Sequence, residues 1–139
     1  MRKLLALLIP LLTSIPLSAE TFTIGPLTYY CSSLSSSTSV SVDDCEANAS
    51  GELIIPESVE YRGKTYSVTN IGSAAFSWCR SLTSVSIPSS VTGIGVRAFY
   101  HCLSLTSVSI PSSVTYIGGQ AFSFCSNLTY IQVESGNPN

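Results

Sequence analysis

Apolar residues return at a fixed interval through the second half of this chain. The pattern I-G-x-x-A-F-x-x-C-x-x-L-x-x-[VI]-x-[IV] opens at Ile71, Ile94 and Ile117, a step of 23 residues each time. The phenylalanine, cysteine and leucine of the pattern keep the same step. A fixed period of about 20 to 29 residues is the signature of a solenoid, whose units cannot bury an apolar face alone and must stack. The pattern therefore predicts recognition by an extended surface rather than chemistry in a cleft.

The second half of each repeat predicts a short strand. Residues 82–87 spell L-x-x-L-x-L, which points Leu82, Val85 and Ile87 inward. The equivalent residues 105–110 and 128–133 would lie beside them as parallel strands about 4.8 Å apart. A first strand at residues 53–55 completes four stacked strands.

The first half of each repeat, Gly72–Cys79 in the first copy, returns the chain over the far side. Ile71, Ala75 and Cys79 recur at a spacing that fits a short helix or 3₁₀ turn. Phe76 would fill the space between strand and arm. The fold class expected is a β-rich solenoid with parallel strands on one face and short helical or 3₁₀ return arms.

Residues 20–50 do not follow the repeat and are expected to form an N-terminal cap. Thr21–Tyr30 reads as one strand and residues 40–42 as a second. A hairpin of these strands, tied by a Cys31–Cys45 disulfide, would cover the open end of the stack, which solenoids need. The repeat region then runs over residues 51–139. Within it, residues 59–68 interrupt the period as a β-hairpin insert with a Gly63-Lys64 corner, projecting from the first unit.

The N-terminus reads as a secretory signal over residues 1–19. Arg2 and Lys3 precede an apolar run and small residues follow, with cleavage expected after Ala19. The alternative is an uncleaved anchor, although the run is short for a span and contains Pro10 and Pro16. The protein is therefore expected to be secreted or on the cell surface, with no membrane contact after cleavage.

Composition excludes one class of partner. Only 10% of the 139 residues are charged, against about 25% in an ordinary protein. Serine fills 27 positions instead, and the net charge is −2. A basic nucleic-acid footprint is missing, so no nucleic-acid partner is expected.

These motifs resemble a known family. L-x-x-L-x-L followed by I-G-x-x-A-F-x-x-C, and the wording I-P-S-S-V-T-x-I-G, are similar to the BspA-like leucine-rich repeat over residues 51–139. The resemblance implies a secreted or surface-anchored protein that binds proteins of a host or partner cell. The chain departs from the family in being short, and residues 134–139 resemble a phrase that usually leads into more repeats. We expect a truncated C-terminus, whose bare last strand would allow self-association.

Two features could indicate a metal site or a catalytic site. The row Cys79, Cys102 and Cys125 suggests a metal site, but zinc needs four converging ligands at tight spacing, so buried packing is favoured. His101 is the only histidine, and the nearest aspartates lie in the cap rather than beside it. The sequence predicts no enzyme, no metal and no cofactor.

Two sets of outward positions are candidate binding surfaces. The repeats differ where their residues face solvent, and one such column holds aromatic or histidine side chains on the return edge. Exposed aromatic columns can anchor a partner, although packing against neighbouring turns, or mere tolerance of these residues, is the favoured interpretation. Strand residues of solenoids often bind as well. The return-edge candidates are Trp78, Tyr100, His101 and Phe124, and the strand candidates are Ser84, Ser107, Tyr130, Ser86, Ser109 and Gln132.

Two functions follow as hypotheses. The first is a binding module that mediates protein–protein interaction or adhesion to host or partner-cell proteins. The second is a passive structural spacer, or a truncated non-binding remnant of a larger surface adhesin. Binding to a partner, and its loss on changing the aromatic column, separates the two.

Overall fold

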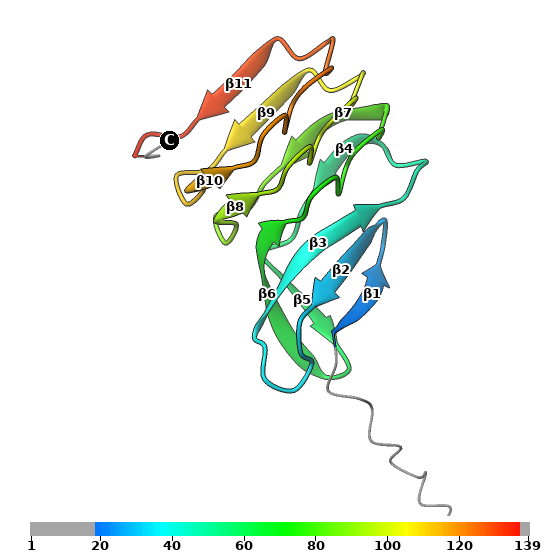
Figure 1. The fold of residues 1–139 in the computed structure, drawn as a ribbon, viewed down its shortest axis with the longest axis vertical. Helices are drawn as coiled ribbons and strands as arrows, with labels where there is room; N and C mark the ends of the chain where they lie inside the picture. Colours follow the sequence, from blue (N-terminus) through cyan, green and yellow to red (C-terminus); the bar gives the residue numbers. More distant parts are fainter. Residues whose placement is uncertain (1–18, 137–139) are drawn as a thin grey trace, which may run out of the picture.

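The computed structural model describes residues 19–136, so nearly all of the predicted signal segment lies outside the described residues. Within that range the chain forms two sheets (Figure 1). Sheet A has the order β1-β2-β3-β6-β8-β10 with β5 on β6, and sheet B has the order β11-β9-β7-β4. The strands are β1 (Glu20–Ile24), β2 (Leu27–Cys31), β3 (Ser39–Cys45), β4 (Ser50–Ile54), β5 (Ser58–Tyr61), β6 (Lys64–Ile71), β7 (Ser81–Ser86), β8 (Gly93–Ile94), β9 (Ser107–Ile110), β10 (Tyr116–Ile117) and β11 (Tyr130–Val133).

The predicted stack of parallel strands is confirmed as sheet B. Ser84 of β7 lies opposite Ser107 of β9, which lies opposite Tyr130 of β11. Successive coils are therefore in register at the 23-residue step. Leu82 and Leu105 are buried at 1% and 0% exposure, and the corresponding leucine of the last coil is partly buried. The inner rows of like side chains form the core of the solenoid.

Each coil also contributes a strand to sheet A, which is the end of β6 in one coil and the very short β8 and β10 in the next two. Ile71 lies opposite Ile94, and Ile94 opposite Ile117, in parallel register. Ile71 and Ile94 are buried, whereas Ile117 is 39% exposed because no later coil covers it among the described residues. A coil is thus a flattened loop with one strand in each sheet, and apolar side chains fill the space between.

The return arms are chains of turns, and the helical or 3₁₀ arms expected from the sequence are wrong. No helix forms within residues 19–136. Backbone donors alternate in direction: Phe76 N–H donates to Ala98 O of the next coil at 2.7 Å, and Ser77 N–H donates to Ala74 O of its own arm at 2.9 Å. Ala74 has φ of 60°, which a right-handed helix excludes. The spacing of the apolar residues fits a short helix and a run of turns equally well. Hydrogen bonds between coils stabilise the turns.

A stack of phenylalanine rings lies beneath these arms. The rings of Phe76 and Phe99 are 4.9 Å apart between centroids, and those of Phe99 and Phe122 are 5.2 Å apart, all nearly parallel. Phe76 and Phe99 are fully buried, while Phe122 at the last coil is partly buried. This spacing equals the distance between hydrogen-bonded strands. The rings and the backbone therefore set the same coil-to-coil distance.

The cap has more strands than the sequence indicated. Residues 21–30 form two strands, β1 and β2, because Gly25 with φ of 59° and Pro26 turn the chain between them. β3 pairs antiparallel with β2 on one side and parallel with β6 on the other. The first coil of the solenoid is therefore joined to the cap by a continuous sheet, at the lower end of Figure 1.

The predicted Cys31–Cys45 disulfide is wrong in this structure, where both residues are buried free thiols. Cys45 lies opposite Leu27 at one end of β2, and Cys31 is at the other end of that strand. Four residues of extended chain separate the two ends by roughly 13 Å. A disulfide needs Cα atoms within about 7 Å. Strand register, which loop length does not reveal, keeps the two cysteines apart.

The interruption after the first strand of sheet B is a hairpin within sheet A. β5 and β6 pair antiparallel and turn at Arg62 and Gly63, with φ of 51° and 75°. The hairpin does not project as expected. Its Tyr61 ring stacks on Phe22 of the cap at 4.0 Å, and Arg62 forms an ion pair with Glu20 at 3.2 Å. The insert is therefore part of the join between cap and repeats.

The glycine of the I-G motif is required by the close approach of two coils. A Cβ atom on Gly95 would lie 2.5 Å from Ser73 N and 2.6 Å from Gly72 C, both backbone atoms of the preceding coil. Gly119, one position beyond the motif, has no atom within 4 Å of such a Cβ. The two glycines make a matched pair for testing the stack.

We expect Gly95→Ala to lower the free energy of unfolding by roughly 1–3 kcal/mol, because the coils must separate to admit the methyl group. Gly119→Ala should leave it unchanged or raise it by up to about 1 kcal/mol, since the substitution restricts the unfolded chain. Urea denaturation followed by circular dichroism measures both. Equal effects of the two substitutions would show that the coils do not approach as described.

Candidate interaction surfaces

The aromatic column expected on the return edge exists and forms a ladder of stacked rings. Trp78 and His101 lie 4.1 Å apart between centroids with 4° between their planes. His101 and Phe124 lie 4.7 Å apart with 6° between their planes. We call these three residues, with Tyr100, the aromatic ladder.

Tyr100 lies edge-on to every ring of the stack. Its centroid is 6.2 Å from Trp78, 4.6 Å from His101 and 5.2 Å from Phe124, with interplanar angles of 70° to 75°. Edge-to-face pairs of this kind add roughly 0.5–1.5 kcal/mol each beyond the area they bury. The ladder is therefore a preformed surface whose side chains are already ordered.

Two cations flank the ladder, and sequence reasoning missed both. The guanidinium of Arg80 lies 4.7 Å from the Trp78 ring centroid, and that of Arg97 lies 5.4 Å from the Tyr100 ring centroid. Arg97 Nε also donates to Gln120 Oε1 at 2.6 Å. The first two repeats carry different residues at these positions, Arg80 against Leu103 and Ala74 against Arg97. Such differences indicate that a position is exposed. The contact of both arginines with the rings depends on arm geometry that the sequence does not show.

The backbone beneath the ladder is held in a conformation that bulky residues rarely adopt. Trp78, His101 and Phe124 have φ of 68°, 58° and 61°. For L-residues this left-handed region costs roughly 1–2 kcal/mol. Trp78 N–H donates to Tyr100 O at 2.8 Å and His101 N–H to Ser123 O at 3.0 Å, so bonding between coils holds the conformation. Ala74, Arg97 and Gln120 are left-handed as well, so the conformation belongs to the turns of every arm.

The ladder presents ring edges to solvent. Trp78 is 50% exposed and Phe124 61% exposed, although stacking covers ring faces within the column. Ring edges carry the positive part of the aromatic quadrupole. The two guanidinium groups add positive charge beside the rings, while Asp44 and Glu46 of the cap share a cavity wall with Trp78.

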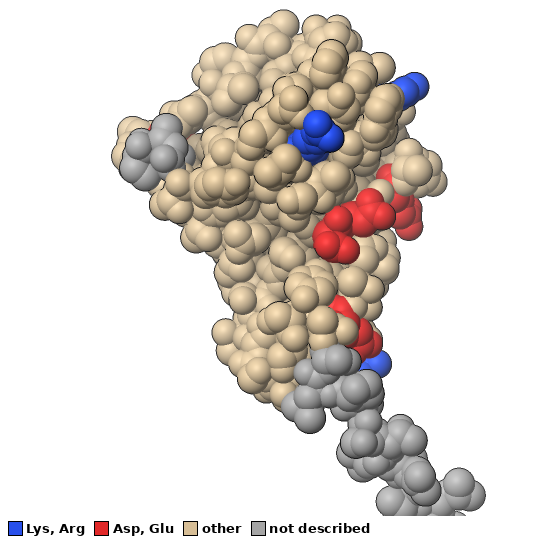
Figure 2. Space-filling model, in the orientation of Figure 1, with Lys and Arg blue, Asp and Glu red and all other residues tan. Residues whose placement is uncertain are grey.

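The candidate columns on sheet B also line up as expected. Ser84, Ser107 and Tyr130 share one register position, and Ser86, Ser109 and Gln132 share the next. None of these six side chains is charged. The space-filling view in Figure 2 shows that most of the visible surface is uncharged, with Lys, Arg, Asp and Glu confined to a few places. Small hydroxyl groups on a flat sheet offer little area for a partner to bury.

The last coil leaves apolar side chains uncovered among the described residues. Ile131 and Val133 of β11 are 44% and 49% exposed, and Tyr116 of β10 is 58% exposed. β11 pairs with β9 on one side only. This open edge is the place where self-association was expected.

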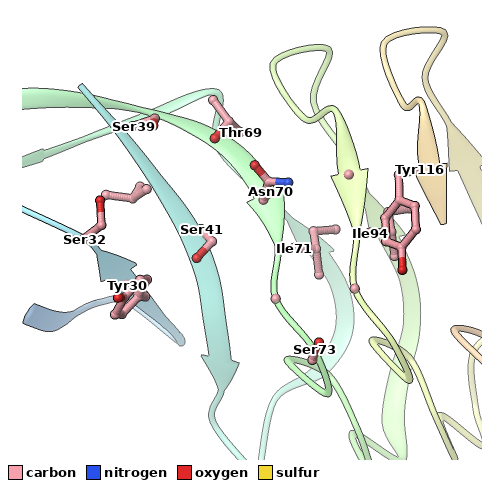
Figure 3. A pocket seen from close by; sticks show the side chains of 14 residues that line it. Tyr30, Ser32, Ser39, Ser41, Thr69, Asn70, Ile71, Ser73, Ile94 and Tyr116 are labelled. Atoms are coloured by element: carbon pink, nitrogen blue, oxygen red, sulfur yellow. The ribbon is translucent and has the colours of Figure 1, made fainter. Parts of the chain in front are cut away.

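A shallow trough on sheet A was not foreseen. It encloses about 380 Å³ and lies between Tyr30 of β2 and Tyr116 of β10, with Ser41 and Asn70 in its floor (Figure 3). Its walls come from the cap, the hairpin and two coils. Because these segments are far apart in the sequence, no local sequence motif predicts the trough.

The cysteine row is packed and hydrogen-bonded. Cys102 Sγ donates to Phe76 O at 3.0 Å, and Cys125 Sγ donates to Phe99 O at 3.0 Å. Burial raises the pKa of Cys102 to about 12, so its thiol keeps its proton at neutral pH. Cys79 and Cys102 are buried and Cys125 is partly buried, so the row packs inside the coils.

Comparison with known proteins agrees with this geometry. Residues 51–138 match the profile of the BspA type leucine-rich repeat region, in six copies. This chain belongs to the BspA-type leucine-rich repeat family. No similar protein was found among curated sequences. No helix in the described part of the chain is long and apolar enough to cross a membrane.

Several solved structures resemble this BspA-type chain. A leucine-rich cell surface protein of Faecalibacterium prausnitzii is 36% identical with a TM-score of 0.70, over 84% of this chain and 32% of that protein. A leucine-rich repeat protein of Bacteroides capillosus is 26% identical with a TM-score of 0.63, over 83% of this chain and 99% of that protein. This chain thus spans about a third of the Faecalibacterium protein. Leucine-rich repeats of this kind are in general scaffolds for protein–protein interaction.

The left-handed backbone of the ladder predicts an unusual order of stabilities. Phe124→Gly should be more stable than Phe124→Ala by roughly 1 kcal/mol, because only glycine adopts positive φ without cost. At neighbouring Ser123, whose φ is not positive, alanine should be at least as stable as glycine. Urea midpoints of the four variants test this. If alanine were the more stable residue at both sites, the backbone would not be held as described.

Proposed function

We propose that this BspA-type leucine-rich repeat chain acts outside the cell and binds a partner protein through the aromatic ladder. The observation that carries the proposal is the ordered stack of Trp78, His101 and Phe124, in which the Trp78 and Phe124 side chains are at least half-exposed. Tryptophan and tyrosine anchors of this kind supply most of the binding energy at protein interfaces. The cell surface name of the Faecalibacterium relative supports the location.

The ladder is a better anchor than the strand face for two physical reasons. Its rings already constrain one another, so a partner loses little side-chain entropy on ordering them. It also offers aromatic area, whereas Ser86 and Ser109 offer small hydroxyl groups that water satisfies equally well. The strand face therefore contributes shape complementarity at most.

The chemistry of the ladder favours an acidic or carbonyl-rich partner surface. The exposed ring edges and the guanidinium groups of Arg80 and Arg97 all attract negative charge. Because these groups are exposed, salt should screen their contribution to affinity. We propose a host or partner-cell surface protein as this partner, with adhesion as the result.

Binding to immobilised host matrix proteins and partner-cell surface extracts tests the proposal. We expect Trp78→Ala combined with Phe124→Ala to weaken binding at least about tenfold, which corresponds to roughly 1.4 kcal/mol. Ser86→Ala combined with Ser109→Ala is the matched control on the strand face and should change affinity by less than about twofold. Raising the salt concentration should weaken binding by the wild-type chain.

Circular dichroism melting would verify that both double variants remain folded. A wild-type chain that retains no partner would favour the passive spacer instead. An equal loss of affinity in the two double variants would show that the partner does not bind mainly at the ladder.

A further inference from the structure

The row of thiols begins at Cys79, in the first copy of the I-G-x-x-A-F-x-x-C pattern. Cys102 donates to the carbonyl of Phe76, and Cys125 to that of Phe99, in each case on the coil before. No earlier copy of the pattern supplies Cys79 with a phenylalanine carbonyl as acceptor. Cys45, at the end of β3 in the cap, lies there instead.

Several contacts bring the end of β3 beneath the first return arm. Val42 lies opposite Ile71, and Gly72 N–H donates to Val42 O at 2.7 Å. A Cβ on Gly72 would lie 3.6 Å from Asp43 Cα, so the two backbones touch. Three residues later, Cys45 reaches the wall of a cavity that Cys79 also lines, and its thiol donates to Glu46 O at 3.7 Å. The two side chains are therefore neighbours, although 33 residues separate them in the sequence.

The pair is buried but opens onto a pocket. Cys45 is 6% exposed and Cys79 3% exposed. Both contribute to the wall of a cavity of about 420 Å³ that Thr28, Asp44 and Trp78 also line. Cys31, in contrast, is fully buried at the far end of β2. Both residues thus border a cavity of the folded protein, from which we expect a small oxidant to approach.

We propose that Cys45 and Cys79 form a disulfide, by exchange with a small-molecule or protein disulfide, that joins the cap covalently to the first repeat. In the exchange, the Cys79 thiolate attacks the oxidant, forms a mixed disulfide and releases one thiol. Cys45 then gives up its proton and attacks the Cys79 sulfur, which releases the second thiol. The protein loses two electrons and two protons, and the oxidant's S–S bond takes up both.

The two thiols are electrostatically suited to these different roles. The neighbouring Cys45 thiol lowers the pKa of Cys79, which favours the thiolate that attacks first. The neighbouring Cys79, together with burial, raises the pKa of Cys45. Once Cys79 is in the mixed disulfide it no longer carries negative charge, so the main cause that holds the proton on Cys45 is removed.

Such a bond would act where the fold changes from cap to solenoid. It would close a chain segment that contains the hairpin of β5 and β6, and the long loop makes the stabilisation of the folded state large. Cys31, Cys102 and Cys125 would stay as thiols. The proposal does not depend on the aromatic ladder or on its partner.

Oxidation of the folded, full chain with oxidised glutathione tests the proposal. We expect a mass loss of about 2 Da, a fall from five titratable thiols to three, and a single cross-linked peptide that contains Cys45 and Cys79. The melting temperature should rise on the order of 10 °C on oxidation. Cys45→Ala and Cys79→Ala should each abolish these changes, and Cys31→Ala, the matched control, should keep them.

Peptide mapping of the wild-type chain decides the matter even if a variant fails to fold. A Cys31–Cys45 peptide, a cross-link between two chains, or five remaining thiols after oxidation would each overturn the proposal. A Cys45–Cys79 peptide without any gain in melting temperature would overturn the claim that the bond stabilises the join between cap and repeats.

Discussion

Backbone hydrogen bonding from one coil to the next is the constraint on which the rest of this structure depends. In the arms it replaces the internal bonding of a helix, as Phe76 N–H donating to Ala98 O shows. It fixes a distance that the rings of Phe76 and Phe99 match at 4.9 Å. It also brings coils so close that Gly95 has no room for a side chain. Glycine and phenylalanine in the repeat are therefore two consequences of one spacing.

The same spacing organises the outer surface. Because every coil repeats its backbone, any outward position becomes a column at the distance of ring stacking. Trp78, His101 and Phe124 form a ladder for the same reason that the buried phenylalanines form a stack. The position is left-handed in all three coils, so the rings are held outward rather than folded into the core. A solenoid thus makes an exposed aromatic surface by varying few residues per turn.

The sequence predicts what depends on periodicity and misses what depends on the register of distant segments. The 23-residue step was enough to place Leu82 and Leu105 inside and the aromatic column outside. The arms were misjudged because Ile71, Ala75 and Cys79 have the same spacing in a helix as in a run of turns. Cys45 was paired with Cys31 by proximity in the chain, whereas β3 carries it to the cavity wall that Cys79 also lines. The trough between Tyr30 and Tyr116 likewise joins segments that no motif links.

Amide hydrogen exchange at Phe76 and Phe99 tests the coil-to-coil bonding most directly. Both amides lie in turns, which ordinarily exchange fast, but both donate to the next coil. The account predicts protection within roughly tenfold of that of Val85 and Val108, whose side chains are buried beneath sheet B, because all four amides open only when coils separate. Exchange of Phe76 and Phe99 at the rate of an exposed loop, with Val85 and Val108 still protected, would contradict it.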